Sequence, residues 1–282
     1  MLFFKKKTQK EKIDFVLNGQ IITKTVRLIK TVEFNEKGLE VHSKIEGGLE
    51  TWNEYDSDGN LTSRKNSEGY SEIHEYDSNE NEIHMKDSKD YEEFLEYDSH
   101  GNVIHYKNSL RRDEKNEYDS DDNLIKKIVN DKEIIVYEYD AFGNLKHSVS
   151  STGEEWNYER TEDGKVLKAT KNKDYGEWYT YDENGNMLSQ DSSTGVKSQY
   201  EYDSKNNMIH SLDENGYEEW FSYDEHGNKI HFKDGTGLEE WWDYDEKNNV
   251  IRTRYADGDE EWILNTYYAD GTLKSAKTYV PA

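Results

Sequence analysis

Hydrophobic and polar residues follow one pattern along most of this chain, and the pattern repeats every 21 residues. A tyrosine followed by an aspartate marks each copy, and these pairs start at residues 55, 76, 97, 118, 139, 181, 202, 223 and 244. Phe34-Asn35 and Arg160-Thr161 occupy the same register without the Tyr-Asp pair. A fixed period of this length indicates a repeat protein, here with eleven units between residues 34 and 264 and no insertion or deletion.

Each unit carries two turn signals, with positions numbered from its tyrosine as position 1. Aspartate at position 2 and glycine at position 5, as in Asp140 and Gly143, are typical of a turn whose last residue is left-handed. Asp122, Asn206 and Asn248 replace the glycine with residues that tolerate this conformation, whereas Glu80 does not fit. A second turn is marked by glycine at position 15 in seven units, namely Gly48, Gly69, Gly153, Gly195, Gly216, Gly237 and Gly258. Turns about every ten residues leave no room for helical periodicity and predict two short strands in each unit.

Side chains alternate between the two faces of a strand, so position 20 and the next position 1 share one face and position 19 lies on the other. Position 19 is tryptophan in five units, at Trp52, Trp178, Trp220, Trp241 and Trp262. We therefore predict an all-β fold, an antiparallel meander of 21-residue β-hairpin repeats forming a coiled, open sheet, as a solenoid or a partial shell.

The two ends of the chain lack the repeat signature. Residues 1–33 are predicted to be a basic N-terminal segment and a capping hairpin, because Asn18-Gly19 between β-prone runs is the strongest short hairpin signal. Residues 34–264 hold the eleven repeats, and residues 265–282 are predicted to be a C-terminal cap.

The repeats resemble the YD repeats of RHS-repeat proteins, whose unit centres on Tyr-Asp-x-x-Gly-Asn/Arg-Leu. The segments 139–145 and 181–187 match this unit closely, and the resemblance covers roughly residues 34–275. It implies a coiled β-sheet of hairpins, which in large members forms a shell around a toxin or a surface for contact between cells. The motif that closes such a shell, the aspartyl self-cleavage segment and a variable toxin domain are not found, so the chain resembles an orphan array. Residues 237–245 are also similar to choline- and glucan-binding repeats, although the Thr-Gly-Trp step of those repeats is missing.

Charge narrows the choice of partner. The net charge is −25, and residues 1–30 contain eight Lys or Arg and two Asp or Glu, which gives this segment +6 and the remainder −31. An acidic surface repels nucleic acid and anionic lipid and attracts basic proteins. We expect a basic protein partner, no nucleic acid and no membrane insertion; the alternative is that the charge only keeps a long sheet soluble.

The cysteine content and the hydropathy of the chain are used to predict the cellular compartment of the protein. The chain has no cysteine, which excludes disulfides and thiolate chemistry. Its N-terminus lacks the apolar run of a signal peptide, and no stretch has the apolar length of a membrane helix. We expect a monomer in the cytoplasm, with signal-independent export as the alternative.

Two sequence patterns resemble metal sites, but the spacing of their residues argues against metal binding. Histidine recurs at position 9, as His42, His84, His105, His147, His210 and His231. Equivalent atoms of neighbouring units lie ~9.6 Å apart, too far to share a zinc ion whose donors lie at ~2.0–2.1 Å. Residues 56–60 resemble the start of a calcium loop, but a strand follows where a bidentate acid is needed. We expect no metal and no cofactor.

The candidate chemistry therefore favours binding over catalysis. Carboxylates repeat with the period, whereas a catalytic pair would break it, and no catalytic motif is present, so we predict no enzyme activity. Aromatic anchors among acids suit a basic protein surface. The predicted partner-binding residues are Trp178, Trp220, Trp241, Trp242, Trp262, Glu240 and Glu261, unless position 19 packs inside the sheet.

Three functions fit these observations. The first is a non-enzymatic repeat module that binds a basic protein, for example an immunity protein that neutralises a toxin domain, as the resemblance to RHS-type systems implies. The second is a cell-surface or cell-wall repeat protein that binds glycans or acts in adhesion. The third is a purely structural piece of a shell.

Overall fold

The computed structural model describes residues 10–172 and 174–282, and every regular element in these residues is a β-strand. Two compact units are present, one formed by residues 1–71 with 219–282 and the other by residues 72–218. The predicted antiparallel meander of hairpins is confirmed. None of the described residues forms a helix long and apolar enough to cross a membrane.

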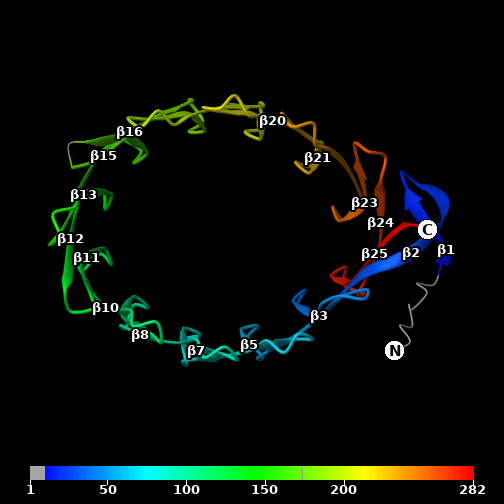
Figure 1. The fold of residues 1–282 in the computed structure, drawn as a ribbon, viewed down its shortest axis with the longest axis horizontal. Coiled ribbons are helices and arrows are strands. Elements are labelled where there is room, and N and C mark those ends of the chain that lie inside the picture. The colour runs from blue at the N-terminus through cyan, green and yellow to red at the C-terminus, as the bar shows by residue number, and fades with distance from the viewer. Residues whose placement is uncertain (1–9, 173) are drawn as a thin grey trace, which may run out of the picture. The chain divides into compact units, whose positions relative to one another are not determined.

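The second unit is a run of hairpins lying side by side (Figure 1). Consecutive strands of this unit pair antiparallel, from β6–β7 to β18–β19. These strands are β6 (Ser71–Tyr76), β7 (Glu82–Asp87), β8 (Glu92–Tyr97), β9 (Val103–Asn108), β10 (Asp113–Tyr118), β11 (Leu124–Val129), β12 (Glu133–Tyr139), β13 (Leu145–Ser150), β14 (Glu155–Arg160), β15 (Val166–Lys171), β16 (Tyr175–Tyr181), β17 (Met187–Ser192), β18 (Lys197–Tyr202) and β19 (Met208–Asp213).

The first unit joins the two ends of the chain. Its strands are β1 (Lys10–Leu17), β2 (Gln20–Phe34), β3 (Glu40–Ile45), β4 (Glu50–Tyr55), β5 (Leu61–Asn66), β20 (Glu218–Tyr223), β21 (Lys229–Asp234), β22 (Glu239–Tyr244), β23 (Val250–Tyr255), β24 (Glu260–Tyr267) and β25 (Leu273–Pro281). Strand β2 pairs antiparallel with β25, beside which it lies in Figure 1. The prediction of an open sheet is therefore wrong, because the first and last strands of the array are hydrogen-bonded to each other.

The length of β2 makes this pairing possible. Residues 20–27 of β2 pair with β1, residues 26–33 pair with β25, and residues 30–34 pair with β3. A register shift between Leu28 and Lys30 allows the strand to bend where these partners change. The hairpin expected at Asn18-Gly19 is present, and both of these residues have positive φ.

The turn at positions 2 to 6 has one geometry throughout. Asp140 is typical: its Oδ1 accepts hydrogen bonds from the backbone N–H of Phe142 and of Asn144. The position-5 residue has positive φ in twelve turns, at Gly38, Gly59, Glu80, Gly101, Asp122, Gly143, Gly164, Gly185, Asn206, Gly227, Asn248 and Gly271. The twelfth turn lies in the predicted C-terminal cap. Strand β24 has eight residues instead of the usual six, which places this turn outside the 21-residue register.

Tyrosines at position 1 tie a hairpin to the one before it in at least six repeats. The Tyr97 hydroxyl donates to the carbonyl of Glu82 at 2.7 Å, and that of Tyr139 donates to the carbonyl of Leu124 at 2.9 Å. Arg160, which replaces the tyrosine in its unit, donates from Nε to the carbonyl of Leu145 at 3.0 Å. The replacement therefore keeps the link.

Hydrophobic burial is concentrated in the first unit. Phe15, Leu17, Val26, Trp262 and Tyr279 form its core cluster, which is contributed by β1, β2, β24 and β25. Buried apolar side chains are scarce in the second unit, where Ala169 is the example among the described residues. That unit is held mainly by the strand ladder, the turns and half-buried tyrosines.

Candidate interaction surface

The repeat presents two different faces. Positions 1, 18 and 20 lie on one face, which we call the tyrosine face, and positions 9, 17, 19 and 21 lie on the other, which we call the histidine face. The strand registers fix this arrangement, since Glu75 at position 21 pairs with His84 at position 9, which pairs with Phe94 at position 19. The tyrosine face is the more covered of the two, as the alternating exposure along strands such as β14 and β18 shows.

Histidines at position 9 bridge three strands. His84 Nδ1 lies 3.4 Å from Glu75 and its Nε2 lies 3.1 Å from Glu92, while its ring stacks on Phe94 with centroids 4.6 Å apart. The hydrogen bond from His84 lowers the pKa of Glu92. The same bridge occurs at His42 (Glu33, Glu50), His105 (Glu96, Asp113), His147 (Glu138, Glu155) and His210 (Glu201, Glu218). These rings are polar links across the sheet.

The bridges do not form metal sites. The two nitrogens of each ring face carboxylates on opposite sides, so one ion cannot contact both. Among the described residues, no group of three or more His, Asp or Glu side chains could hold a metal ion.

Charges are paired across strands where an acid at position 21 faces a lysine or arginine at position 9. Lys126 Nζ lies 2.6 Å from Glu117, and Arg252 Nε lies 2.7 Å from Asp243. Where position 21 is threonine, as at Thr180, it is hydrogen-bonded to serine at position 9, Ser189. Opposite partners of this kind stabilise one strand register over the others.

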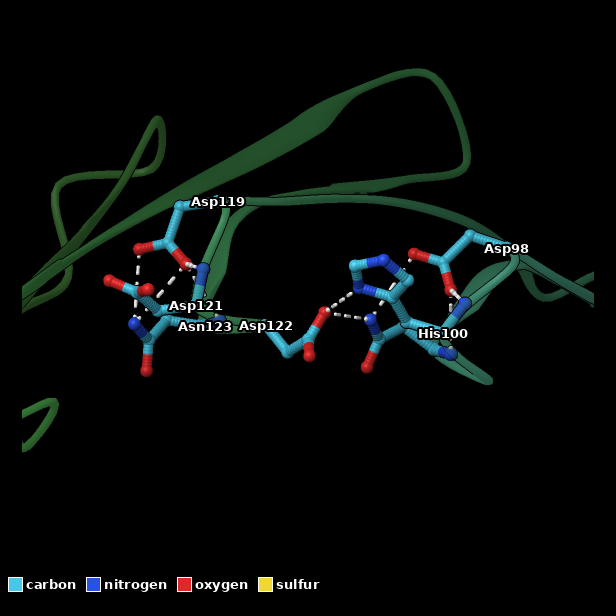
Figure 2. Close-up of polar contacts among 7 residues, drawn as sticks. Asp98, His100, Asp119, Asp121, Asp122 and Asn123 are labelled. Carbon is cyan, nitrogen blue, oxygen red and sulfur yellow. Dashed lines mark hydrogen bonds and ion pairs between the residues drawn. The ribbon is translucent and has the colours of Figure 1, made fainter.

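The turns are linked to one another along the edge of the sheet. Figure 2 shows that the carboxylate of Asp122 reaches the neighbouring turn, where its Oδ1 accepts from Asn102 Nδ2 at 2.8 Å and lies 2.7 Å from His100 Nδ1. This contact with Asp122 raises the pKa of His100. Asn206 and Asn248 accept in the same way from Asn186 and Asn228. Asp122, Asn206 and Asn248, which replace glycine at position 5, thus bridge adjacent turns.

The calcium-like segment is saturated by its own donors. The Oδ1 atom of Asp56 accepts from the backbone N–H groups of Asp58, Gly59 and Asn60, and its Oδ2 accepts from the Asn60 amide. These bonds lower the pKa of Asp56, the largest effect coming from the Asn60 N–H. The segment is a carboxylate-capped turn.

The structure divides the predicted partner-binding residues between the two faces. Trp178, Trp220, Trp241 and Trp262 occupy position 19 on the histidine face, whereas Trp242, Glu240 and Glu261 lie at positions 20 and 18 on the tyrosine face. Trp178 and Trp220 are exposed, with 43% and 37% of their surface accessible, and Trp241 is half-buried. Trp262 is 1% exposed and has no surface left for a partner. These residues do not form one cluster.

A row of exposed apolar side chains runs along the histidine face of the second unit. Position 19 is Ile73, Phe94, Val136 or Trp178 in four of its repeats, and each of these side chains exposes more than a third of its surface. Lys115 and Asn157 occupy position 19 in the repeats between Phe94 and Trp178 and interrupt the row. Exposed carboxylates at position 21 accompany the row, namely Glu75, Glu96, Glu117, Glu138 and Glu159. Sequence reasoning singled out only the tryptophans of this column; the shared position 19 was the signal for the others.

Trp262 is covered by the N-terminal hairpin. The Phe15 ring lies 5.0 Å from the Trp262 ring, at an interplanar angle of 44°. Lys24 Nζ lies 4.9 Å from the same ring and 2.6 Å from Glu260 Oε1. Phe15 and Lys24 were not identified from the sequence, although the alternation Ile13, Phe15, Leu17 marks an apolar strand face.

Comparison with known proteins identifies similar sequences and folds. A family profile described as Teneurin YD-shell matches residues 79–273. No curated relative matches the chain. The crystal structure of TcdB2-TccC3 is 14% identical with a TM-score of 0.48, and covers 92% of this chain and 17% of the matched one. The crystal structure of TcdB2-TccC3-TEV is 11% identical with a TM-score of 0.47, and covers 96% of this chain and 18% of the matched one. The structure of the Photorhabdus luminescens Tc holotoxin pore is 10% identical with a TM-score of 0.42, and covers 89% of this chain and 21% of the matched one. This chain therefore spans about a fifth of the length of those proteins.

Proposed function

Because this chain belongs to the Teneurin YD-shell family of repeats, we propose that it is a non-enzymatic repeat module that binds a basic protein partner. The observation that carries the proposal is the row of exposed apolar side chains on the histidine face of the second unit, with carboxylates beside it. Aromatic side chains that become buried in an interface supply most of its binding energy. Surrounding carboxylates accelerate the approach of a basic protein and disfavour acidic ones.

A concrete form of this proposal is an immunity protein that neutralises a basic toxin domain. Its support is the resemblance of the repeats to those of RHS-type systems, together with a net charge of −25 on a chain without cysteine. No catalytic role is assigned, because the carboxylates and histidines of the described residues recur with the repeat and are paired with one another.

A second candidate is binding of glycans. The exposed rings of Trp178 and Trp220 favour it, since a flat indole can stack on a sugar ring. Such stacking depends little on ionic strength, whereas attraction between exposed charges is screened by salt.

The test uses the full chain as bait and follows a captured protein by its dissociation constant between 50 and about 500 mM salt, a range that spans most of the screening. We expect affinity to fall steeply with salt. The double variant Glu96→Lys with Glu138→Lys should weaken binding at least tenfold, because both carboxylates stand exposed beside the apolar row. The control Glu183→Lys changes an exposed acid in a turn and should have less than a twofold effect.

Two results would contradict the proposal. Equal losses of affinity per substitution in the double variant and in the control would place the site away from the histidine face. Binding that is unchanged across the salt range and requires Trp178 would favour the glycan-binding alternative.

A further inference from the structure

At one place the chain shows what covers its own histidine face. The β1–β2 hairpin packs on the last repeat, where Phe15 contacts Trp262 and Lys24 pairs with Glu260. Arg252 at position 9 completes the set, with its guanidinium 5.1 Å from the Trp262 ring. The covered set is thus an aromatic residue at position 19, a carboxylate at position 17 and a cationic residue at position 9.

The hairpin and the surface beneath it have opposite charges. Residues 10–27 of the hairpin contain four Lys or Arg and two Asp or Glu, a charge of +2, while residues 31–282 carry −31. Docking leaves Phe15 3% exposed and Trp262 1% exposed. Apolar burial and charge pairing therefore act together at this contact.

Three further sets have an aromatic residue at position 19 and a carboxylate at position 17 in the same register, with histidine at position 9 where the covered set has arginine. They are Trp52 with His42 and Glu50, Phe94 with His84 and Glu92, and Trp241 with His231 and Glu239. In each set the imidazole stacks on the aromatic ring, with centroids 5.6, 4.6 and 5.2 Å apart, respectively. The carboxylate lies 3.0, 3.1 and 2.9 Å from Nε2. No described segment packs over Phe94, which is 46% exposed.

We infer that these three sets are docking sites for β-hairpins of a partner protein that present an aromatic residue and a lysine on one face. The aromatic ring would cover the position-19 side chain as Phe15 covers Trp262. The lysine would reach the position-17 carboxylate, as Lys24 reaches Glu260 at 2.6 Å. This inference rests on the proposed function and specifies which basic surface the partner offers.

A second copy of the chain fits these sites less well than a partner does. The β1–β2 hairpin that serves as the template is already part of the core of its own chain, with Val26 fully buried and Phe15 nearly so. Offering it to another molecule would expose this cluster to water, at a cost that grows with the apolar area exposed.

The probe is a peptide of residues 10–27, closed by a disulfide between added terminal cysteines and titrated into the full-length protein. We expect binding that weakens with salt, and at least a tenfold loss of affinity when the peptide carries Phe15→Ala and Lys24→Ala. In the protein, Phe94→Ala should remove one site, and the triple variant with Trp52→Ala and Trp241→Ala should remove the rest.

The matched control is Val136→Ala. Val136 also stands exposed at position 19, but Ile134 replaces the carboxylate at position 17 in its repeat, so peptide binding should not change. Melting curves establish that each variant is folded. If loss of the half-buried Trp52 and Trp241 unfolds the triple variant, Phe94→Ala alone is the test. Equal binding of the substituted peptide, or full binding by the folded Phe94→Ala protein with unchanged stoichiometry, would overturn the inference.

Competition between the peptide and the basic partner distinguishes failure of the proposed function from failure of the hairpin inference. If a basic partner binds in a salt-dependent way but is neither displaced by the peptide nor weakened by Phe94→Ala, the protein-binding function stands and the hairpin inference fails. If the peptide binds as expected while the partner binds independently of salt, the proposed recognition of a basic protein fails.

Discussion

Trp262 in the first unit and Trp178 in the second occupy the same repeat position and have opposite surroundings. Both lie at position 19, yet Trp262 is 1% exposed beneath the N-terminal hairpin and Trp178 is 43% exposed. The repeat determines which face a side chain joins. Whether that face is buried depends on a segment outside the repeat. For this reason tryptophan at position 19 is a core residue in the first unit and a surface residue in the second.

The two units consequently differ in what stabilises them. The first has a hydrophobic cluster contributed by both ends of the chain, so its stability depends on contacts between residues far apart in sequence. In the second, each hairpin contacts its sequence neighbours, and stability is approximately a sum over units and their interfaces. We therefore expect substitutions in the first unit to have larger and more cooperative effects.

The largest expected effect separates the two tryptophans. Trp262→Ala should lower the free energy of unfolding by about 3–5 kcal/mol, because it opens a cavity under Phe15 and Tyr279. Trp178→Ala should cost less than about 1 kcal/mol, because much of its side chain is already in water. Urea unfolding followed by circular dichroism measures both. Equal costs would show that the hairpin does not contribute to the core in solution.

Much of this fold could be predicted from the sequence, because its rules are local. The 21-residue period, the turn at Asp140 and the alternation of faces all follow from residues close to each other in the chain. The pairing of β2 with β25 could not, since it joins segments about 250 residues apart and no local pattern specifies such a partner. The predicted open sheet failed for that reason.

The candidate surface shows the same division. The column at position 19 was visible in the sequence, and its face followed from strand alternation. The burial of Trp262 was not visible, because it depends on Phe15 and Lys24 from outside the repeat. Sequence alone also gave no account of Glu80, which the structure places in the same left-handed turn conformation as the glycines, with φ of 65°.

The next largest effect on stability is expected at the turn of positions 2 to 6, which occurs in both units. Glu80→Gly should stabilise the protein by about 1 kcal/mol, because a left-handed conformation is unfavourable for a residue with a Cβ atom. The reciprocal change Gly101→Glu should destabilise by about as much. A Cβ at Gly101 would meet no atom closer than 4.0 Å, so the cost comes from the backbone alone. Melting temperatures of the two variants moving in the same direction would contradict this reading.

A smaller effect is expected for the charge pair that accompanies the covered tryptophan. A double-mutant cycle on Lys24 and Glu260 should give a coupling of about 0.5–1 kcal/mol, since both side chains are partly shielded, with 34% and 18% of their surface accessible. The uncovered pair Lys168–Glu159, at 36% and 68%, should give a coupling near zero. If the two couplings are equal, coverage by the hairpin does not strengthen the pair.

The smallest effect is expected at a single turn of the second unit, and it depends on pH. The backbone N–H of Asn144 is the main cause that lowers the pKa of Asp140, and the N–H of Phe142 acts in the same direction. A carboxyl group whose pKa is lower in the folded state stabilises the protein above its unfolded pKa, and this contribution is lost as the pH falls through the folded value. Asp140→Asn keeps an acceptor oxygen but has no charge, so its melting temperature should lie below that of the wild type at pH 7. The difference should shrink as the pH falls below about 4, the ordinary aspartate value, and through the lower pKa of the folded state. Asp140→Ala removes the acceptor altogether and should be less stable than the wild type at every pH. If the difference in melting temperature between the wild type and Asp140→Asn widens in acid, the charge does not stabilise this turn.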